Sequence, residues 1–410
     1  MSQVHLIQNP FRPGAGQRPL YLAGRTQEQD QFASMLEQNP ISQNAILTGL
    51  RGVGKTVLLE QLKPIAQGQG WLWTGNDLSE SVSLSEENLA RRIVVDLSIL
   101  LAPLITLTQP VKQVGIEKEP KTESRPLQHN DLWGIYEQTP GLTIDRLKAV
   151  LSAAWSLIAP GGIKGIVFAY DEAQNLADHA SDKQYPLSLL IDLFSAFQRA
   201  TDCRFLLVLS GLPTLYPKLN EARAYTERMF HVMQLQRLSD AEAREAVTQP
   251  IKISNSPLQF SNSTIETIVS MSAGYPYFIQ FIGKEVFDSW IGKIHKGEAA
   301  SVPAGQILEK LDQDFFAPRW ARATDRQQDF MKVIATLPNG EDEFTVQEIV
   351  NAAKTVLTKG FSSSHANQML TALAEMGLVY RSRRGGYAFA VPLLSMYCKR
   401  QPWNGIALKE

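Results

Sequence analysis

Residues Gly49–Thr56 match the pattern G-x-x-x-x-G-K-[ST] without a mismatch. Glycines at these positions let backbone N–H groups curl around an anion, and the N-terminus of a following helix adds partial positive charge. The Lys55 ammonium would reach the outer phosphates of a nucleotide, and the Thr56 hydroxyl would ligate Mg²⁺. A glycine-rich turn with an incidental lysine is the alternative. The flanks disfavour it, because residues 44–48 resemble a buried strand and residues 57–62 a helix.

A second stretch, residues 165–175, is an apolar run that ends abruptly in Asp171 and Glu172. Such a run is typical of a buried parallel strand, and ligands of open α/β sheets bind at the carboxyl edge of the strands. Asp171 would hold Mg²⁺ through water, and Glu172 would polarise the water that attacks the terminal phosphorus. The alternative is that Asp171 and Glu172 only begin a helix, where acidic side chains interact favourably with the helix dipole.

Together the two motifs predict a nucleoside triphosphate site with ATP and Mg²⁺ as cofactors. Thr56 and Asp171 are the expected metal ligands, and Lys55 and Glu172 the expected catalytic residues. The expected nucleotide-binding segment comprises Gly49, Leu50, Arg51, Gly52, Val53, Gly54, Lys55, Thr56 and Val57.

Composition limits the remaining possibilities. The 410 residues suffice for two or three domains, and 44% apolar with 20% charged residues is ordinary for a soluble globular protein. The net charge of −1 gives no overall preference for nucleic acid. Two cysteines, Cys203 and Cys398, indicate a reducing compartment. The N-terminus does not resemble a signal peptide, and no stretch could span a bilayer, so we expect a cytoplasmic protein without a membrane partner.

Periodicity predicts the elements that must position these residues. We expect an extended arm over residues 1–20 and a partly mobile insertion over residues 105–143, rich in Pro, Lys, Glu, Gln and Gly. A tolerated surface loop is the alternative for this insertion. Further strands are expected at 71–74, 204–209 and 230–235, and helices at 26–37, 85–101, 144–158 and 186–200.

With these motifs and elements, the chain resembles the AAA+ and STAND group of P-loop ATPases, and within it most nearly the initiator-like, origin-recognition branch. The resemblance covers nearly the whole chain and implies an α/β fold whose parallel sheet has the order 5-1-4-3-2, with a helical lid and a C-terminal winged helix. In that group the strand between the loop strand and the acidic strand ends in a polar residue, called sensor 1, that touches the γ-phosphate. Ser210 occupies that position. A serine that starts a turn is the alternative.

The resemblance implies further site residues. Gly24-Arg25 looks like the short Gly-Arg motif of that group, which lies near the adenine and the phosphate-binding loop. Gly274-Tyr275-Pro276 looks like the lid element whose proline packs against the adenine base. Arg25 and Pro276 are therefore expected to contact nucleotide. The lid arginine called sensor 2 is not evident, because the lid helix offers only Lys284. This departure favours a slow switch over a fast motor.

An arginine finger is expected before the last strand of the sheet. Arg228 stands there, where many AAA+ proteins keep an arginine that neutralises charge on the γ-phosphate of a neighbouring subunit. Arg223, on the same expected helix, is the rival, and a solvated surface arginine is the alternative for both. A trans contact implies a homo-oligomer.

The sequence pattern of the C-terminal part predicts three helices, over residues 325–337, 345–353 and 362–376, followed by a β-hairpin with a long basic turn. This is the winged-helix pattern. Arg381, Arg383 and Arg384 at the turn suit contacts with the phosphates of double-stranded DNA. Winged helices also dock proteins, and turn arginines also keep a hairpin soluble.

We therefore expect an arm over residues 1–20, a nucleotide-binding domain over 21–238, a lid over 239–320 and a winged helix over 321–402. The favoured function is an ATPase whose nucleotide-dependent assembly acts on or marks DNA. The main alternative is a STAND-type switch that oligomerises on a trigger and recruits a separate effector protein. A DNA-binding regulator with a degenerate ATPase core is disfavoured by the intact motifs.

Overall fold

The computed structural model describes residues 8–14, 16–110, 122–200, 203–296, 301–383, 385–404 and 408. The chain divides into two compact units. Unit 1 comprises residues 1–25, 49–57 and 235–410, and unit 2 comprises residues 26–48 and 58–234. The division into arm, nucleotide-binding domain, lid and winged helix stays a prediction.

Unit 2 is built on a five-stranded parallel sheet in the order β2-β5-β6-β1-β7. When the five strands of this sheet are numbered 1 to 5 along the chain (β1, β2, β5, β6, β7), the order read from β7 is 5-1-4-3-2, as predicted. Strand β6 lies between the loop strand β1 and the acidic strand β5, also as predicted. The central strands are buried along their whole length, which explains their continuous apolar sequence. The strands are β1 (Asn44–Thr48), β2 (Trp71–Thr74), β5 (Gly165–Tyr170), β6 (Phe205–Gly211) and β7 (Phe230–Gln234).

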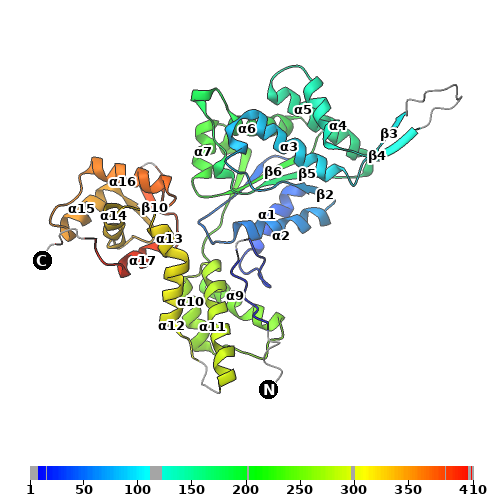
Figure 1. Ribbon diagram of the computed structural model, residues 1–410. Coiled ribbons are helices and arrows are strands. Elements are labelled where there is room, and N and C mark those ends of the chain that lie inside the picture. Colours follow the sequence, from blue (N-terminus) through cyan, green and yellow to red (C-terminus); the bar gives the residue numbers. More distant parts are fainter. Residues whose placement is uncertain are drawn as a thin grey trace, which may run out of the picture. The chain divides into compact units, whose positions relative to one another are not determined.

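Helices of unit 2 cover the sheet (Figure 1). Their ends follow local sequence signals: α3 begins after Ser85, whose side chain accepts a hydrogen bond of 3.1 Å from the Asn88 N–H. Acidic residues follow in its first turn, where they oppose the positive end of the helix dipole. The helices are α1 (Thr26–Glu37), α2 (Lys55–Gly68, which starts in the loop), α3 (Glu86–Leu101), α4 (His129–Gln138), α5 (Thr143–Ile158), α6 (Pro186–Arg199), α7 (Leu215–Ala222) and α8 (Thr226–Met229).

The insertion is more structured than its composition predicts. Strands β3 (Thr106–Pro110) and β4 (Thr122–Pro126) pair as an antiparallel hairpin that projects beside α4 (Figure 1). Arg125 forms a bidentate ion pair with Asp131 of α4, at 2.7 and 2.6 Å. Much of the expected loop is therefore hairpin and helix, whereas residues 111–121 lie outside the described residues.

The lid of unit 1 is helical. Its helices are α9 (Asp240–Ile253), α10 (Asn262–Ser272), α11 (Pro276–Lys296), α12 (Ala304–Leu311), a π-helical turn (Asp312–Phe316) and α13 (Ala317–Trp320). Phe316 stacks on Tyr397 with 5.1 Å between ring centroids, so the last turns of the lid share a core with the C-terminal domain.

The described part of the N-terminal arm is docked on the lid. Phe11 is buried and stacks on Phe260. The side-chain amide of Asn9 donates to the Lys284 carbonyl at 3.0 Å and to the Asp288 carboxylate at 2.7 Å. Phe11 therefore belongs to the core of unit 1, and the extended arm stays a prediction.

The C-terminal domain has the expected succession of three helices and a hairpin, with one further strand. The sheet has the order β8-β10-β9, and both pairings are antiparallel. Only residues 384 and 385 separate β9 from β10, so the turn is shorter than predicted. The elements are α14 (Asp325–Ala335), β8 (Glu343–Thr345), α15 (Val346–Val356), α16 (Ser363–Glu375), β9 (Val379–Arg383), β10 (Gly386–Phe389) and α17 (Leu394–Arg400).

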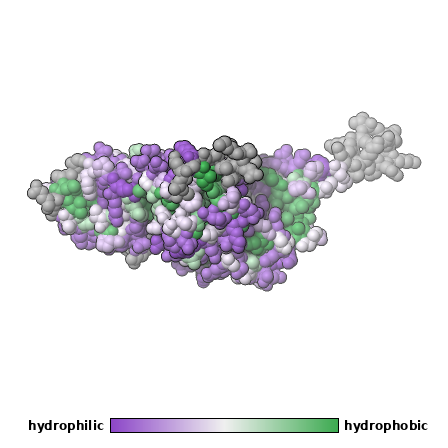
Figure 2. Space-filling view, turned by 90° about the horizontal axis from the view of Figure 1, so that it is seen from below, coloured by the Kyte–Doolittle hydropathy of each residue, from purple (hydrophilic) through white to green (hydrophobic). Residues whose placement is uncertain are grey.

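In the described part of the chain, no helix has both the length and the hydropathy needed to cross a bilayer. Hydrophilic side chains cover much of the face shown in Figure 2, and hydrophobic residues form separate patches between them.

Candidate nucleotide-binding site

The predicted phosphate-binding loop follows β1 directly and leads into α2. Gly52 and Gly54 have φ angles of 79° and 92°, a region that residues with a side chain rarely adopt. Such left-handed positions turn successive backbone N–H groups toward one concavity. The loop conformation therefore requires the glycines of the motif and suits the binding of an anion.

Side chains brace this loop from within unit 1. The buried guanidinium of Arg25 donates from Nη2 to the Val53 carbonyl at 3.0 Å and to the Gln236 carbonyl at 2.7 Å. The Lys55 ammonium donates to the Gly49 and Leu50 carbonyls at 2.9 and 3.0 Å. Arg25 thus contacts the loop backbone, which is one of the two contacts the sequence predicted for it. A contact with adenine stays a prediction.

The lid reaches the loop at the start of α11, which begins at Pro276. The N–H of Tyr277 donates to the Gly52 carbonyl at 3.1 Å. The turn before α11 is itself held by the Leu238 N–H, which donates to the Gly274 carbonyl at 2.8 Å. Arg25, the loop and Pro276 are therefore brought together within unit 1.

Unit 2 gathers the acidic residues at the carboxyl edge of its sheet. Asp171 is buried, and its Oδ1 accepts hydrogen bonds from the Ser210 hydroxyl at 2.6 Å and the Glu172 N–H at 2.8 Å. Glu172 is exposed and has a φ angle of 51°. Such a left-handed conformation is uncommon for a residue with a side chain and concentrates at functional sites. Asp171, Glu172 and Ser210 are brought together as predicted by the sheet order.

The sequence analysis missed Gln174. Its Nε2 donates to Glu172 Oε2, its Oε1 accepts from the Leu212 N–H at 3.0 Å, and its main-chain carbonyl accepts from Lys218 Nζ at 2.8 Å. One amide side chain thus ties Glu172 to the segment that follows Ser210. The only signal in the sequence was its position three residues after Asp171, which by itself indicates no contact.

Asp77 is a second residue that was missed. It lies just beyond β2 and forms an isolated parallel bridge with Asp171, and the next N–H, of Leu78, donates to the Asp171 carbonyl at 2.9 Å. Burial raises the pKa of Asp77, and the negative charges of Asp171, Glu172 and Glu60 raise it further. The carboxyl edge of the sheet is therefore a region of negative potential, which a divalent cation would offset.

The two candidate finger arginines differ in their surroundings. Arg223 caps α7 and forms a bidentate pair with Asp192 at 3.0 and 2.8 Å, a contact that raises the pKa of Arg223. Arg228 lies on the separate helix α8 and is exposed. Its guanidinium has no hydrogen-bond or ion-pair partner among the described residues. The prediction of one shared helix is therefore wrong, and Arg228 is the one available to a second molecule.

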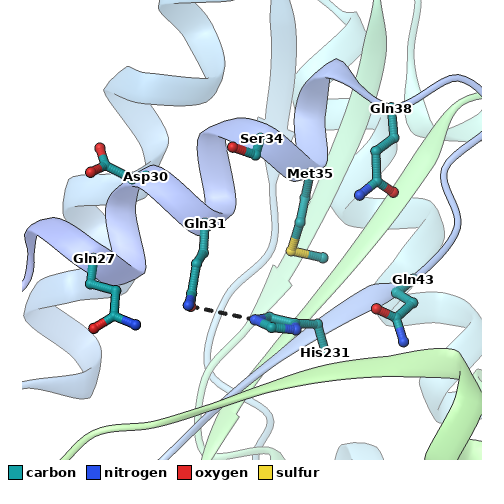
Figure 3. Close-up of a pocket in the computed structure, with 8 residues that line it drawn as sticks. All are labelled: Gln27, Asp30, Gln31, Ser34, Met35, Gln38, Gln43 and His231. Carbon is teal, nitrogen blue, oxygen red and sulfur yellow. Dashed lines mark hydrogen bonds between the residues drawn. The ribbon is translucent and has the colours of Figure 1, made fainter.

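A pocket of about 540 Å³ lies between α1 and β7 of unit 2 (Figure 3). Its lining is mostly amide and hydroxyl side chains, and His231 Nε2 lies 3.4 Å from Gln31 Oε1. No residue of the predicted site lines this pocket, so it does not contribute to the candidate site. The lining residues are Gln27, Asp30, Gln31, Ser34, Met35, Gln38, Gln43 and His231.

Two of the expected DNA-contacting arginines, Arg381 and Arg383, belong to β9. Arg381 is exposed, only the backbone of Arg383 is described, and Arg384 lies outside the described residues. Arg400, another basic residue of the C-terminal segment, forms an ion pair with Asp312, with 3.0 Å between Nε and Oδ2. Helix α16, which would enter the major groove, contains neither lysine nor arginine.

Comparisons with solved structures bear on the fold. The Aeropyrum pernix ORC2 protein, in its ADPNP–ADP complexes, matches with a TM-score of 0.54 and 14% identity over 94% of this chain and 96% of that chain. Its ADP form matches with a TM-score of 0.53 and 13% identity, over 94% and 95% of the two chains. The chain has the AAA+ fold of the origin-recognition proteins. At this identity the likeness shows the fold alone.

Other comparisons add little to this likeness in fold. Aeropyrum pernix ORC1 in complex with DNA matches with 13% identity over 94% of both chains, but its TM-score of 0.44 is too low to carry an argument. A family model described as a domain of unknown function (DUF8462) matches residues 313–398, which span the end of the lid and most of the C-terminal domain. No curated protein is significantly similar in sequence.

Proposed function

We propose that this AAA+ protein binds ATP with Mg²⁺, hydrolyses it slowly, and acts on or marks DNA through a nucleotide-dependent assembly of its own copies. The observation that carries the proposal is the braced phosphate-binding loop. Its glycines have the φ angles that turn N–H groups toward an anion, and Arg25 and Tyr277 hold its backbone. The AAA+ fold of the chain supports the same reading.

The residues present fit a bound Mg²⁺–ATP. Backbone N–H groups of the loop and the Lys55 ammonium would bind the phosphates, and Thr56 and Asp171 would hold the metal. When bound, Mg²⁺ neutralises charge on the phosphate oxygens. Ser210 keeps the Asp171 carboxylate oriented by its hydrogen bond. Glu172, exposed and not ion-paired within the described residues, would accept the proton of the attacking water.

Two variants test the ATPase. Lys55→Ala is expected to abolish tight ATP binding, because it removes the charge that faces the outer phosphates. Glu172→Gln is expected to bind ATP as the wild type does and to turn it over far more slowly, because the water loses its base. Equilibrium nucleotide binding and steady-state turnover measure both effects. Wild-type turnover by Glu172→Gln would overturn the assignment of the base.

We propose that the C-terminal domain is a winged helix and that it makes the contact with double-stranded DNA. Arg381 is exposed on β9, and Arg383 and Arg384 follow it closely in the sequence. Like charges this close in sequence are unfavourable unless a counter-charge such as a phosphate backbone offsets them.

A STAND-type signalling switch is the second candidate function. It is favoured by α16, which presents Asn367, Gln368 and Thr371 to solvent but no basic side chain. Such a face suits docking of an effector protein. Measuring the mass of the protein in solution with ATP, with ADP and with DNA separates the two candidates, because only the first requires DNA in the assembly.

A further inference from the structure

A lysine of α7 joins that helix to the turn that carries Glu172. After Glu172 the chain continues as one turn of 3₁₀ helix, Ala173–Asn175. Lys218, in the first turn of α7, donates from Nζ to the Gln174 carbonyl at 2.8 Å. Because Gln174 is also the residue whose side chain bonds to Glu172, the lysine fixes the main chain at the point from which this amide extends.

The Gln174 side chain is confined as well. Its Oε1 accepts a hydrogen bond from the Leu212 N–H at 3.0 Å, while its Nε2 donates to Glu172 Oε2. Gly211 leaves room for the amide, since a β-carbon at this position would lie only 2.7 Å from Gln174 Oε1. With the bond from Lys218, both the main chain and the side chain of Gln174 are therefore anchored to the segment that follows β6.

Lys218 carries its charge in a partly buried position without an acid at ion-pair distance among the described residues. Burial lowers the pKa of Lys218, and the negative charge of Asp178 opposes this effect. Burying a charge costs free energy unless the charge is paired. Stability alone would therefore favour an uncharged side chain here, and the bond to Gln174 is the contact that an uncharged apolar side chain could not make.

We propose that Lys218 is a positioning residue for ATP hydrolysis: its ammonium holds Gln174, and Gln174 in turn orients the Glu172 carboxylate for its role as the base. The inference rests on the proposed function. In this role Lys218 touches neither the nucleotide nor the attacking water. It should therefore affect the rate of hydrolysis and leave the affinity for ATP unchanged.

The test measures the ATP dissociation constant and the single-turnover rate, both with Mg²⁺, on the full chain. Lys218→Met keeps the length of the side chain and removes the ammonium, and Lys218→Gln removes the charge but keeps a polar end group. Both variants should lose about threefold to tenfold in rate and change the ATP dissociation constant by less than about twofold, because a misplaced general base slows the chemical step. Lys218→Arg, which keeps a charged donor, should recover part of the rate.

A double-mutant cycle tells whether Lys218 acts through Gln174. If it does, Lys218→Met combined with Gln174→Ala should be no slower than Gln174→Ala alone. Lys164→Met is the matched control, because Lys164 is an exposed lysine just before β5, at the amino end of the strand whose carboxyl end leads to the acids. Its rate should equal that of the wild type.

Melting curves without nucleotide check that each variant is folded. Wild-type rates in Lys218→Met and Lys218→Gln, or parallel losses of rate and ATP affinity in both, would overturn the inference. Rate losses that multiply in the double variant would also overturn it, because they would show an effect independent of Gln174. Wild-type protein that binds no ATP, or binds it without hydrolysis, would refute the proposed function itself.

Discussion

Ser210 donates its buried hydroxyl to Oδ1 of Asp171 at 2.6 Å, and this bond joins the carboxyl ends of the neighbouring strands β6 and β5. The resemblance to AAA+ proteins implied that Ser210 touches the γ-phosphate. In the structure its hydroxyl proton is directed to the carboxylate expected to hold Mg²⁺, so Ser210 orients that carboxylate.

This arrangement predicts the effect of Ser210→Ala. Because outer-shell partners of metal ligands tune metal affinity, the Mg²⁺ concentration that half-saturates ATP binding should rise by about tenfold. Titration of Mg²⁺ at fixed ATP measures the change, and Ser210→Thr, which keeps the hydroxyl, is the control. An unchanged Mg²⁺ dependence in Ser210→Ala would assign the serine to the phosphate or to packing.

Gln174→Ala should separate turnover from binding. The variant removes the amide that holds Glu172 Oε2 and the Leu212 N–H, so the Glu172 carboxylate loses its orientation. We expect turnover to fall by about tenfold or more while the ATP dissociation constant stays unchanged, because general-base catalysis depends on geometry. Single-turnover kinetics with bound ATP provide the measurement. A parallel loss of affinity would indicate a structural role only.

Arg228→Ala should lose assembly-dependent turnover and keep ATP binding. An arginine finger supplied in trans stabilises charge on the transferred phosphoryl group, so specific activity of the wild type should rise with protein concentration. Activity per subunit that stays flat through a measured monomer-to-oligomer transition would refute the trans finger.

Arg223→Ala is the matched control for Arg228. Its partly exposed pair with Asp192 contributes about 0.2–1 kcal/mol to stability, so the variant should melt slightly earlier. Turnover of the folded protein should equal that of the wild type at every concentration. Loss of turnover in this variant alone would reverse the assignment of the finger.

Replacement of Arg381, Arg383 and Arg384 by alanine should weaken binding to double-stranded DNA of any sequence. Each phosphate neutralised by an arginine releases about one counterion, so the slope of log affinity against log salt should flatten by roughly two to three units. ATP affinity should not change. If the variant binds DNA as the wild type does, the turn is a protein-docking surface and the signalling-switch function takes precedence.

Short-range features of the sequence were enough to predict the strands of the parallel sheet, most helices, the loop and the acidic strand end. Burial periodicity and motif spacing are local properties, and the order β2-β5-β6-β1-β7 followed once the resemblance to AAA+ proteins was stated. The insertion was misread because the segments of the β3–β4 hairpin, with prolines at their ends, have the composition of a polar loop.

Only the tertiary structure decided how side chains from distant segments meet. Arg25 bonds to Val53, Gln174 to Leu212 and Arg223 to Asp192. A lone arginine or glutamine carries no periodic signal, and its hydrogen-bond partner depends on distances that the packing of the whole chain sets. The sequence therefore predicted the chemistry of the loop and the acids, and the fold decided which residues lie beside them.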